Sequence, residues 1–519
     1  MESATLTGLG GVPEPRKGSE GAAAPALKPN AITYLSNLVI GVASTAPGYS
    51  LASVLGAIVA VSAMGTHAPA VIIVAFLPML GIALAYKAMN RADPDCGTTF
   101  SWMTRAMGPT AGWVGGWAIL MADIVVNANQ AQIAGVYGYS LFGLSSLQNS
   151  TLAVTILGVV FIIVLTIICW VGIELSARLQ QALLGMEFFT LVLFSIVALI
   201  KVYTSHPAHS IHVSLDWFNP FALGFTPLLL GLLLGIFLYW GWDSGVTVNE
   251  ETENAGSAPG KAAVMSTLLL VAIFLLVTVA AQSFAGTGYL ANNSSDVFNS
   301  GLGQSVLGGT FDKLLIIAVL TSATAATQTT ILPAARSALS MARRGAVPAK
   351  FGEIDPKLLT PGFATIVAGV LSVIWYVFIV QVSTNVLSDC VTGLGFLVAF
   401  YYGFTGFTCT WFYRKELFKS VSNFLQLGLL PTAGGLALMG IFVKALIQYQ
   451  NPANDISKPL LGIGIPVWIG VGLLVVGLIL AIVLRVPYPE FFKEKTVKAG
   501  EPFKIVTAEK DFIPADSIL

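Results

Sequence analysis

Hydroxyl-bearing residues, a proline and a glycine interrupt the first long apolar segment of the sequence, in the stretch ASTAPGYSLA at residues 43–52. Pro47 lacks a backbone N–H and Gly48 weakens a helix, so we expect one helix to end here and another to begin. The free N–H groups at the start of a helix bind anions, typically a carboxylate. Ser44, Thr45 and Ser50 could add hydroxyl donors. The alternative is a proline kink that binds no ligand.

A second interruption lies in the stretch FLYWGWDSGVTVNEETEN, residues 237–254, where Gly241 and Gly245 follow a run of aromatic residues. We expect a second broken helix here. Asp243 could accept N–H groups at the start of the continuing half-helix, which we favour over a direct contact with a ligand. The aromatic side chains could enclose an apolar group or form cation–π contacts with an amine, and the sequence does not choose between them.

Two carboxylates lie inside apolar segments, where an ionisable residue costs about 2.5–3.5 kcal/mol on insertion scales. Glu187 occurs in ARLQQALLGMEFFTLVLF, and burial would favour its neutral form, so it could take up and release a proton. A structural carboxyl bonded to a neighbouring helix is the alternative. Asp123 occurs in LMADIVVNANQAQIAG, with Asn127 one turn later on the same helix face. Asp123 could meet an ammonium group, or both residues could hydrogen-bond to a neighbouring helix.

Hydroxyl and amide groups also gather in the segment that follows residue 312. A sodium ion needs several oxygen ligands, which the hydroxyls here and carbonyl groups of the first broken helix could supply. Hydrogen bonding between helices would produce the same polar face, and we favour that interpretation. The residues of this face are Thr321, Ser322, Thr324, Thr327 and Gln328, of which Thr321, Ser322 and Thr324 form the candidate cation site.

The composition indicates a protein with many membrane-spanning segments. The 519 residues are 55% hydrophobic and 10% charged, whereas soluble globular proteins carry about a quarter charged residues. Windows of about 20 apolar residues predict an all-α polytopic membrane protein with about twelve spans. The predicted spans are 31–61, 68–90, 108–142, 151–171, 177–203, 221–248, 261–285, 312–342, 362–386, 389–413, 424–446 and 464–485.

The distribution of basic residues predicts how the chain crosses the membrane. With the N-terminus inside, the outer loops hold four of the 26 Lys and Arg residues, and the other 22 lie inside. Because cytoplasmic loops carry an excess of Lys and Arg, we expect a multi-pass protein of the cell membrane with both termini in the cytoplasm. Trp113 and Trp117, near the inner start of span three, are expected in the interfacial aromatic belt. The four outer basic residues are Lys201, Lys313, Lys444 and Lys458.

The two interruptions predict an internal repeat. Pro47 and Gly241 are 194 residues apart and fall in spans one and six, at equivalent positions of two five-helix halves. Corresponding interrupted spans indicate an inverted repeat with a binding site near the bilayer midplane. The predicted organisation is a disordered cytoplasmic tail at 1–30, a ten-helix core at 31–413 with repeats at 31–203 and 218–413, helices eleven and twelve at 424–485, and a cytoplasmic tail at 486–519.

Three stretches together resemble the amino acid–polyamine–organocation permeases, whose fold is of the leucine-transporter type. ALAYKAMNRADPDCGTTFSWMTRAMGP, residues 83–109, resembles the family's connection between the second and third helices, where a polar turn precedes a glycine and an aromatic pair. FLYWGWDSGVTVNEE, residues 237–251, resembles the sixth helix, which ends in paired glutamates. ARSALSMARRGAVPAKFGEIDPKLLTP, residues 335–361, resembles the eighth helix and its inner loop. The resemblance covers spans one to ten, residues 31–413.

The resemblance implies secondary transport of amino acids or related amines, driven by a proton or sodium gradient or by exchange. In the sixth helix it implies backbone carbonyls for an amino group and aromatic faces for a substrate side chain. The third helix lines the central cavity of this fold, so Asp123 would meet a substrate ammonium there. The implied carboxylate site consists of Ala43, Ser44, Thr45, Ala46 and Gly48, and the implied sixth-helix site of Tyr239, Trp240, Gly241 and Trp242.

Two positions depart from the family pattern, and a third carries a different charge. The family's first helix usually has a Gly-Ser-Gly-like turn, whereas this chain has Ser-Thr-Ala-Pro-Gly at residues 44–48. The inner loop of the eighth helix usually has Arg-Asp-Gly, and here Arg344 replaces the acid, which puts a local salt bridge in doubt. Some proton-coupled members have a lysine where Glu187 stands in this chain. Glu187 is therefore predicted as the proton-coupling residue.

The sequence thus favours a secondary permease that imports an amino acid with a proton. An exchanger or a polyamine carrier is the alternative within this class. A membrane sensor that binds substrate without moving it is disfavoured, because the roughly 34 residues after Arg485 contain no domain-sized core. There is no P-loop, nucleotide fingerprint or Ser-His-Asp arrangement, and the four cysteines lack metal spacing. We therefore expect no enzyme activity, cofactor, metal site or nucleic-acid partner.

Overall fold

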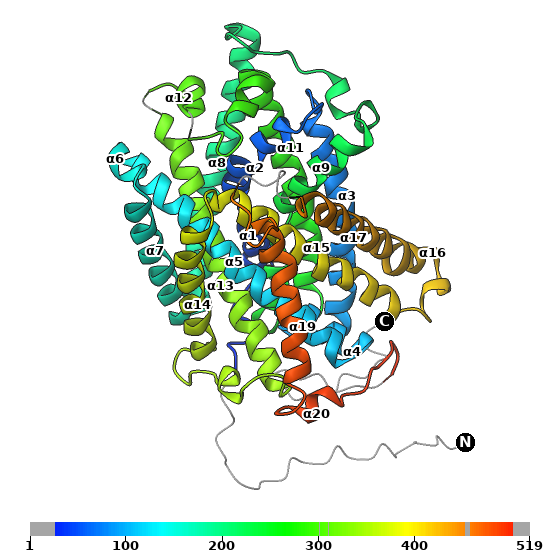
Figure 1. Ribbon diagram of the computed structural model, residues 1–519. Helices are drawn as coiled ribbons and strands as arrows, with labels where there is room; N and C mark the ends of the chain where they lie inside the picture. The colour runs from blue at the N-terminus through cyan, green and yellow to red at the C-terminus, as the bar shows by residue number, and fades with distance from the viewer. Residues whose placement is uncertain (1–25, 300, 310, 452–456, 502–519) are drawn as a thin grey trace, which may run out of the picture.

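The computed structural model describes residues 26–299, 301–309, 311–451 and 457–501. Within these ranges the regular elements are helices, accompanied by isolated bridges between Ile32 and Thr252 and between Leu460 and Ile463. The helices run mostly along one common direction and pack around a buried centre (Figure 1). The predicted all-α class is confirmed.

The helices fall into three groups along the chain. Those before residue 205 are α1 (Tyr34–Thr45), α2 (Pro47–Ala60), α3 (Ala68–Ala92), α4 (Thr99–Met107), α5 (Pro109–Leu141), α6 (Ser145–Gln148), α7 (Thr151–Val171) and α8 (Ile173–Thr204). The next are α9 (Phe225–Leu238), α10 (Ser244–Thr247), α11 (Ala258–Asn292), α12 (Leu302–Leu307), α13 (Asp312–Arg343), α14 (Gly362–Val382) and α15 (Val386–Phe412). The last are α16 (Val421–Asn423), α17 (Leu430–Tyr449), α18 (Ile465–Val467), α19 (Leu473–Val483) and α20 (Pro489–Phe492).

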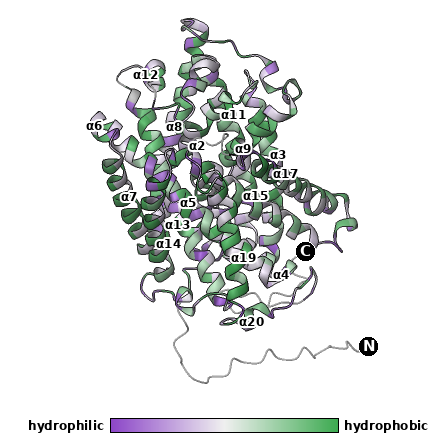
Figure 2. Cartoon of the chain, in the orientation of Figure 1, coloured by the Kyte–Doolittle hydropathy of each residue, from purple (hydrophilic) through white to green (hydrophobic). Residues whose placement is uncertain are grey.

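These helices account for the predicted membrane spans. Among the described residues, 11 helical segments are long and apolar enough to cross a bilayer. The remaining predicted span corresponds to α9, a shorter apolar helix that ends at the second interruption. Large apolar side chains are exposed along α7, α14 and α19, and Figure 2 shows helices that are hydrophobic over most of their length. A bilayer is the environment that such an exposed apolar surface requires.

Both interruptions are true helix breaks, as predicted. α1 ends at Thr45, Ala46 takes the left-handed conformation at φ 49°, and Pro47 is the first residue of α2. α9 ends at Leu238, and Gly241 has φ 118° ahead of the short α10. A methyl group added to Gly241 would lie 2.7 Å from the carbonyl oxygen of Ser44. The two broken helices therefore touch at their breaks, deep in the molecule.

The bundle has two ends, which we name by the elements that lie there. The α20 end carries α4 and α20, at the bottom of Figure 1, and the α12 end carries α12 near the top. The predicted tails lie mostly outside the described residues, which omit 1–25 and 502–519. In their described parts, Leu27 is buried against Cys96 and Leu339, and the Phe491 ring stacks on Phe100.

Candidate functional site

The carboxylate of Glu187 lies at the start of the half-helix α2. Its Oε1 accepts a hydrogen bond from the backbone N–H of Gly48 at 2.7 Å and one from the hydroxyl of Ser322 at 2.9 Å. The Ser322 hydroxyl in turn accepts the N–H of Tyr49 at 3.2 Å. Because Pro47 has no N–H, these contacts use the first free donors of α2. The Glu187 side chain itself occupies the position that the sequence predicts for a substrate carboxylate.

Glu187 nevertheless keeps one oxygen without a partner. The residue is fully buried, and Oε2 has no hydrogen-bond partner among the described residues. A buried anion with an unsatisfied oxygen is costly unless the group can be neutralised. The alternative interpretation, a structural carboxyl that bonds to neighbouring helices, applies to Oε1 but not to Oε2. Oε2 is free to carry a proton.

The hydroxyl groups of the first break have separate partners. Ser44 Oγ lies 2.7 Å from Ser244 Oγ and so joins the two broken helices. Thr45 Oγ1 donates to the carbonyl of Gly41 at 3.1 Å, and Ser50 Oγ donates to the carbonyl of Thr45 at 2.7 Å. The Ser50 hydroxyl thus satisfies a carbonyl group at the end of α1, where helical N–H partners are missing. Ala43, Ala46 and Gly48 contribute backbone only, and all six residues are buried.

Asp243 does not cap α10, contrary to our expectation. Its carboxylate accepts hydrogen bonds from the hydroxyls of Tyr402 at 2.8 Å, Tyr401 at 3.1 Å and Tyr86 at 3.5 Å, and it makes no side-chain cap. The Tyr401 hydroxyl also accepts the indole N–H of Trp240. Three tyrosine donors satisfy the acid better than the orphan N–H groups of one helical turn.

The aromatic residues of the second break pack in the interior in different directions. The Tyr239 hydroxyl donates to the carbonyl of Ile72 at 3.0 Å, so it is directed toward α3. The Trp242 ring stacks on Tyr402 with centroids 5.2 Å apart, and its indole N–H has no partner. Trp240 is held through Tyr401. In this conformation these side chains contact other residues of the protein. Their predicted contacts with a substrate remain predictions.

Asp123 and Asn127 have different surroundings, although they share a helix face. Asn127 donates to Ser372 Oγ at 3.0 Å and accepts from Thr330 Oγ1 at 2.6 Å, so it joins α5 to α13 and α14. Asp123 is 4% exposed, its Oδ2 has no hydrogen-bond partner within the described ranges, and its charge interacts with that of Asp243. The bonding alternative therefore holds for Asn127. The role of Asp123 as a partner for a substrate ammonium stays a prediction.

The three residues of the candidate cation site have different hydrogen-bond partners, and the cation site itself stays a prediction. Ser322 reaches Glu187, whereas Thr321 Oγ1 donates to the carbonyl of Ala318 at 3.0 Å and Thr324 Oγ1 to that of Leu320 at 2.7 Å. Further along, Thr327 bonds Gln130 and Gln328 bonds Ser176. The helix-bonding interpretation of this face is confirmed at those two residues.

An ion-pair cluster joins several elements at the α20 end. Arg336 forms a bidentate pair with Glu251, with Nε–Oε2 at 2.5 Å and Nη2–Oε1 at 2.8 Å. Arg343 pairs with Glu250 at 2.7 Å, and Arg344 pairs with Asp95 at 3.4 Å and Glu494 at 2.8 Å. Arg344 stands where the family's Arg-Asp-Gly turn has an acid, and the acids that pair with Arg344 come from other elements.

Burial and ion pairing act in opposite directions on the acids of this cluster. Burial raises the pKa of Asp93 to about 6, although the Nε of Arg105 lies 3.0 Å from its Oδ2. Burial also acts on Asp95, but the positive charges of Arg344 and Arg105 prevail and lower its pKa. These interactions hold the α3–α4 connection to the end of α13.

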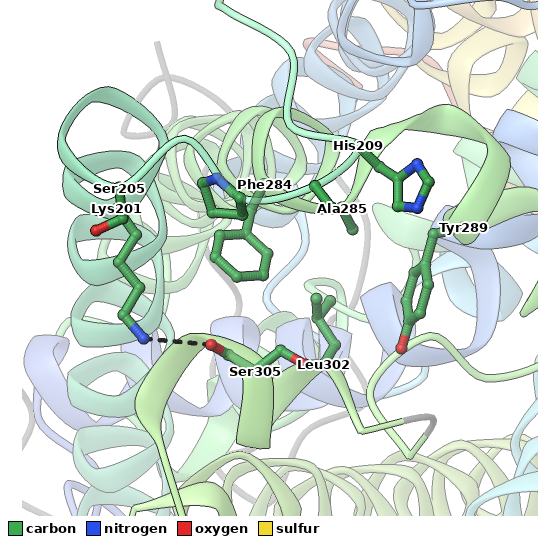
Figure 3. A pocket seen from close by; sticks show the side chains of 10 residues that line it. Lys201, Ser205, His209, Phe284, Ala285, Tyr289, Leu302 and Ser305 are labelled. Carbon is green, nitrogen blue, oxygen red and sulfur yellow. Dashed lines mark hydrogen bonds between the residues drawn. The ribbon is translucent and has the colours of Figure 1, made fainter.

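A separate cavity of about 540 Å³ lies at the α12 end (Figure 3). The wall is formed by α12, by the ends of α8 and α11 nearest to it, and by the loop around residue 208. Within it, Lys201 Nζ donates to the carbonyl of Ser305 at 3.2 Å, and the rings of Phe284, His209 and Tyr289 face the open space. None of the residues predicted at the two breaks lines this cavity.

The sequence model of a family described as amino acid permease matches residues 32–484 of the chain. The match includes both helix breaks, Asp123, Glu187 and the ion-pair cluster up to Arg344. The chain belongs to the amino acid permease family. The resemblance on which the sequence analysis relied is thereby confirmed, together with the fold class.

Curated relatives of this permease are similar at low identity. The branched-chain amino acid permease of Lactococcus lactis is 25% identical over 228 residues, which are 42% of this chain and 48% of that protein, so the alignment spans about half of the relative. The low-affinity putrescine importer of Escherichia coli is 22% identical over 79% of this chain and 85% of its own length. The arginine/ornithine antiporter of Latilactobacillus sakei is 25% identical over 67% of this chain and 72% of its own length.

The three tyrosines that hold Asp243 in this permease were not predicted from the sequence. Tyr401 and Tyr402 form a pair inside span ten, 158 and 159 residues from Asp243 in sequence. Two adjacent tyrosine hydroxyls at membrane depth need acceptors, and this need is the signal that could have identified them. This signal does not identify Asp243 as the acceptor of their hydrogen bonds.

We expect Gly241→Ala to destabilise the permease strongly. Gly241 has φ 118°, which side-chain-bearing residues rarely adopt, and the new methyl group would meet the Ser44 carbonyl. Backbone strain of this kind costs about 1–3 kcal/mol, to which the clash adds. The melting temperature of the purified protein in detergent should fall well below that of Gly440→Ala, a matched control in α17 with open space around it. Equal melting temperatures would contradict the close contact of the two breaks.

Proposed function

We propose that this permease is a secondary transporter that carries an amino acid with a proton, and that Glu187 is the proton site. The observation that carries the proposal is the hydrogen bond from the Gly48 N–H to the Glu187 carboxylate at 2.7 Å. It joins a titratable group to the backbone donors at the first helix break. The same donors are those that an amino acid carboxylate would need.

Competition for these donors would couple the proton to the substrate. As an anion, Glu187 interacts favourably with the start of α2 and occupies the Gly48 N–H. Protonation on the free Oε2 removes the charge and weakens that interaction, so the N–H becomes available to another carboxylate. Substrate and proton then each favour binding of the other, and by thermodynamic linkage this coupling is reciprocal.

Asp123 supplies the complementary charge for the substrate amino group. It is buried, one of its oxygens has no partner, and it lies on the helix α5 that packs against α13. The charge of Asp243 interacts with that of Asp123, but the Asp243 carboxylate already accepts hydrogen bonds from three tyrosine hydroxyls. Asp123 is therefore the acid that remains open to an ammonium group.

A polyamine is the second candidate substrate. A diamine carries an ammonium group that Asp123 could bind, and one relative is a putrescine importer. A diamine has no carboxylate, so it would not displace Glu187 from Gly48. Its transport would therefore depend on Asp123 but less on Glu187.

We propose that transport follows alternating access in the cell membrane, with the α20 end in the cytoplasm. The ion-pair cluster and most of the basic residues lie at that end, as expected for cytoplasmic loops. The two broken helices touch each other through Ser44 and Ser244 and would move together against α5, α13 and α14.

The substrate assignment is tested by uptake into proteoliposomes. We would offer labelled leucine, arginine and putrescine to the wild type and to Asp123→Asn under an inward proton gradient. The account predicts saturable uptake of an amino acid and its loss in Asp123→Asn, because the amide cannot neutralise an ammonium group. Asp216→Asn, an exposed acid outside the bundle, is the control and should transport normally. Transport of putrescine alone would favour the second candidate, and undiminished uptake by Asp123→Asn would contradict the role of Asp123.

A further inference from the structure

An apolar crevice of about 170 Å³ lies between α5, α13 and α14, away from the two helix breaks. Its lining contains no charged residue and no hydroxyl. The indole N–H groups of Trp113 and Trp117 are already bonded, to the carbonyls of Ala346 at 3.3 Å and Leu473 at 2.8 Å. These two tryptophans were expected at the interfacial belt, yet Trp113 is buried. Both rings line the crevice and stack on each other, with centroids 5.6 Å apart.

The crevice has the depth and exposure of a lipid site. Its α5 residues run from Trp113 to Ile124, about 16 Å along a helix axis, which is about half of the hydrocarbon thickness of a bilayer. Leu371 lines it and is 41% exposed, on the same face of α14 as the exposed Ile374. The crevice therefore opens onto the surface that faces the bilayer, within the leaflet at the α20 end.

Two exposed cations contact residues that are close to the crevice lining. Lys350 is exposed, and its Nζ lies 4.5 Å from the centroid of the Phe363 ring, which contacts the ring of Phe351 at 5.0 Å. Phe351 lines the crevice. Arg485 donates to the Thr110 hydroxyl at 2.9 Å, one helical turn before Trp113. No ion pair is recorded for either cation among the residues that the structure describes.

We propose that the crevice binds one acyl chain of an anionic phospholipid, with the phosphate headgroup at Lys350 and Arg485. An apolar cavity of about 150 Å³ in a protein core stays dry and binds an apolar molecule, so this volume suits a segment of hydrocarbon chain. The flanking cations select the charge of the headgroup, since basic residues at a membrane surface attract anionic lipids. The bound chain would fill the space between α13, which carries Ser322 and the arginine cluster, and α14.

Tryptophan quenching tests the proposal directly. The purified permease would be placed in vesicles of phosphatidylcholine that contain increasing fractions of brominated phosphatidylglycerol or brominated phosphatidylcholine. Bromine on an acyl chain quenches only tryptophans that it contacts. We expect stronger quenching by the phosphatidylglycerol at equal mole fraction. The additional quenching should vanish in the double variant Trp113→Phe/Trp117→Phe, which removes the two reporters in the crevice.

Matched variants separate the acyl chain from the headgroup. Ala338→Phe on α13 and Ala364→Leu on α14 would fill the crevice from opposite walls and remove the additional quenching. Lys350→Ala should abolish the preference for phosphatidylglycerol, whereas Lys357→Ala, an exposed lysine of the same loop, should keep it. Equal quenching by both lipids in the wild type would overturn the proposal. The double variant Trp113→Phe/Trp117→Phe leaves the crevice walls otherwise unchanged. If the additional quenching by phosphatidylglycerol persisted in that variant, the proposal would also be overturned.

Discussion

Glu187→Gln should abolish accumulation driven by a proton gradient while the protein continues to exchange substrate across the membrane. Glutamine keeps the shape of the side chain and an oxygen that can accept the Gly48 N–H and the Ser322 hydroxyl. It cannot gain or lose a proton at neutral pH. A gradient of one pH unit is worth about 1.4 kcal/mol per proton, which drives about tenfold accumulation of substrate when one proton is coupled. For each pH unit of the gradient, the variant should therefore accumulate about tenfold less substrate than the wild type.

The control for this variant is another glutamate of the same helix. Glu174 is half exposed near the start of α8 and pairs with Lys28 at 2.7 Å, so Glu174→Gln should accumulate substrate like the wild type. Counterflow of labelled substrate, with no gradient imposed, shows that each variant still transports. Accumulation by Glu187→Gln equal to that of the wild type would make Glu187 a structural residue.

Arg336→Met should cause the largest loss of stability that a single substitution produces in the ion-pair cluster. Arg336 and Glu251 are 1% and 0% exposed, and their pair is bidentate. Removing one partner of a buried ion pair leaves an uncompensated charge and costs about 3–5 kcal/mol. The free energy of unfolding, measured by denaturant titration in mixed micelles, should fall by that amount.

A second substitution distinguishes the lost pair from lost packing. The double variant Arg336→Met/Glu251→Gln removes both charges, and we expect it to recover a large part of the loss, because replacing a whole buried pair is often close to neutral. Lys493→Gln removes an exposed partner of Glu490 and should leave the stability unchanged. A loss below about 1 kcal/mol in Arg336→Met, the size of an ordinary substitution, would contradict the importance of the pair.

Local signals in the sequence were sufficient for the fold. Hydropathy alone locates the spans, and the proline and glycine in the first break and the glycine in the sixth span locate the breaks, because each acts on its own backbone. The break at Ala46 falls inside the stretch that first indicated it. Glu187 was also found by a local signal, since a charge within an apolar run requires a compensating contact.

Partners that are distant in sequence could not be predicted in the same way. Gly48 and Glu187 are 139 residues apart, and nothing in either segment names the other. Asp243 was assigned to the nearest N–H groups, whereas tyrosines from other helices satisfy it. The Ser322 hydroxyl, predicted as part of a cation site, donates to Glu187, which is 135 residues away in sequence. Composition shows that a helix is polar, and the packing decides which polar groups meet.

The central claim is that substrate and proton move together, and one measurement tests it most directly. Wild-type permease in sodium-free proteoliposomes would receive labelled substrate under an inward proton gradient, with the membrane potential clamped at zero. The account predicts accumulation above equilibrium that rises by about tenfold for each pH unit and disappears when the gradient is collapsed. Uptake that stops at the equilibrium concentration under the proton gradient, or that needs sodium to exceed it, would contradict the account.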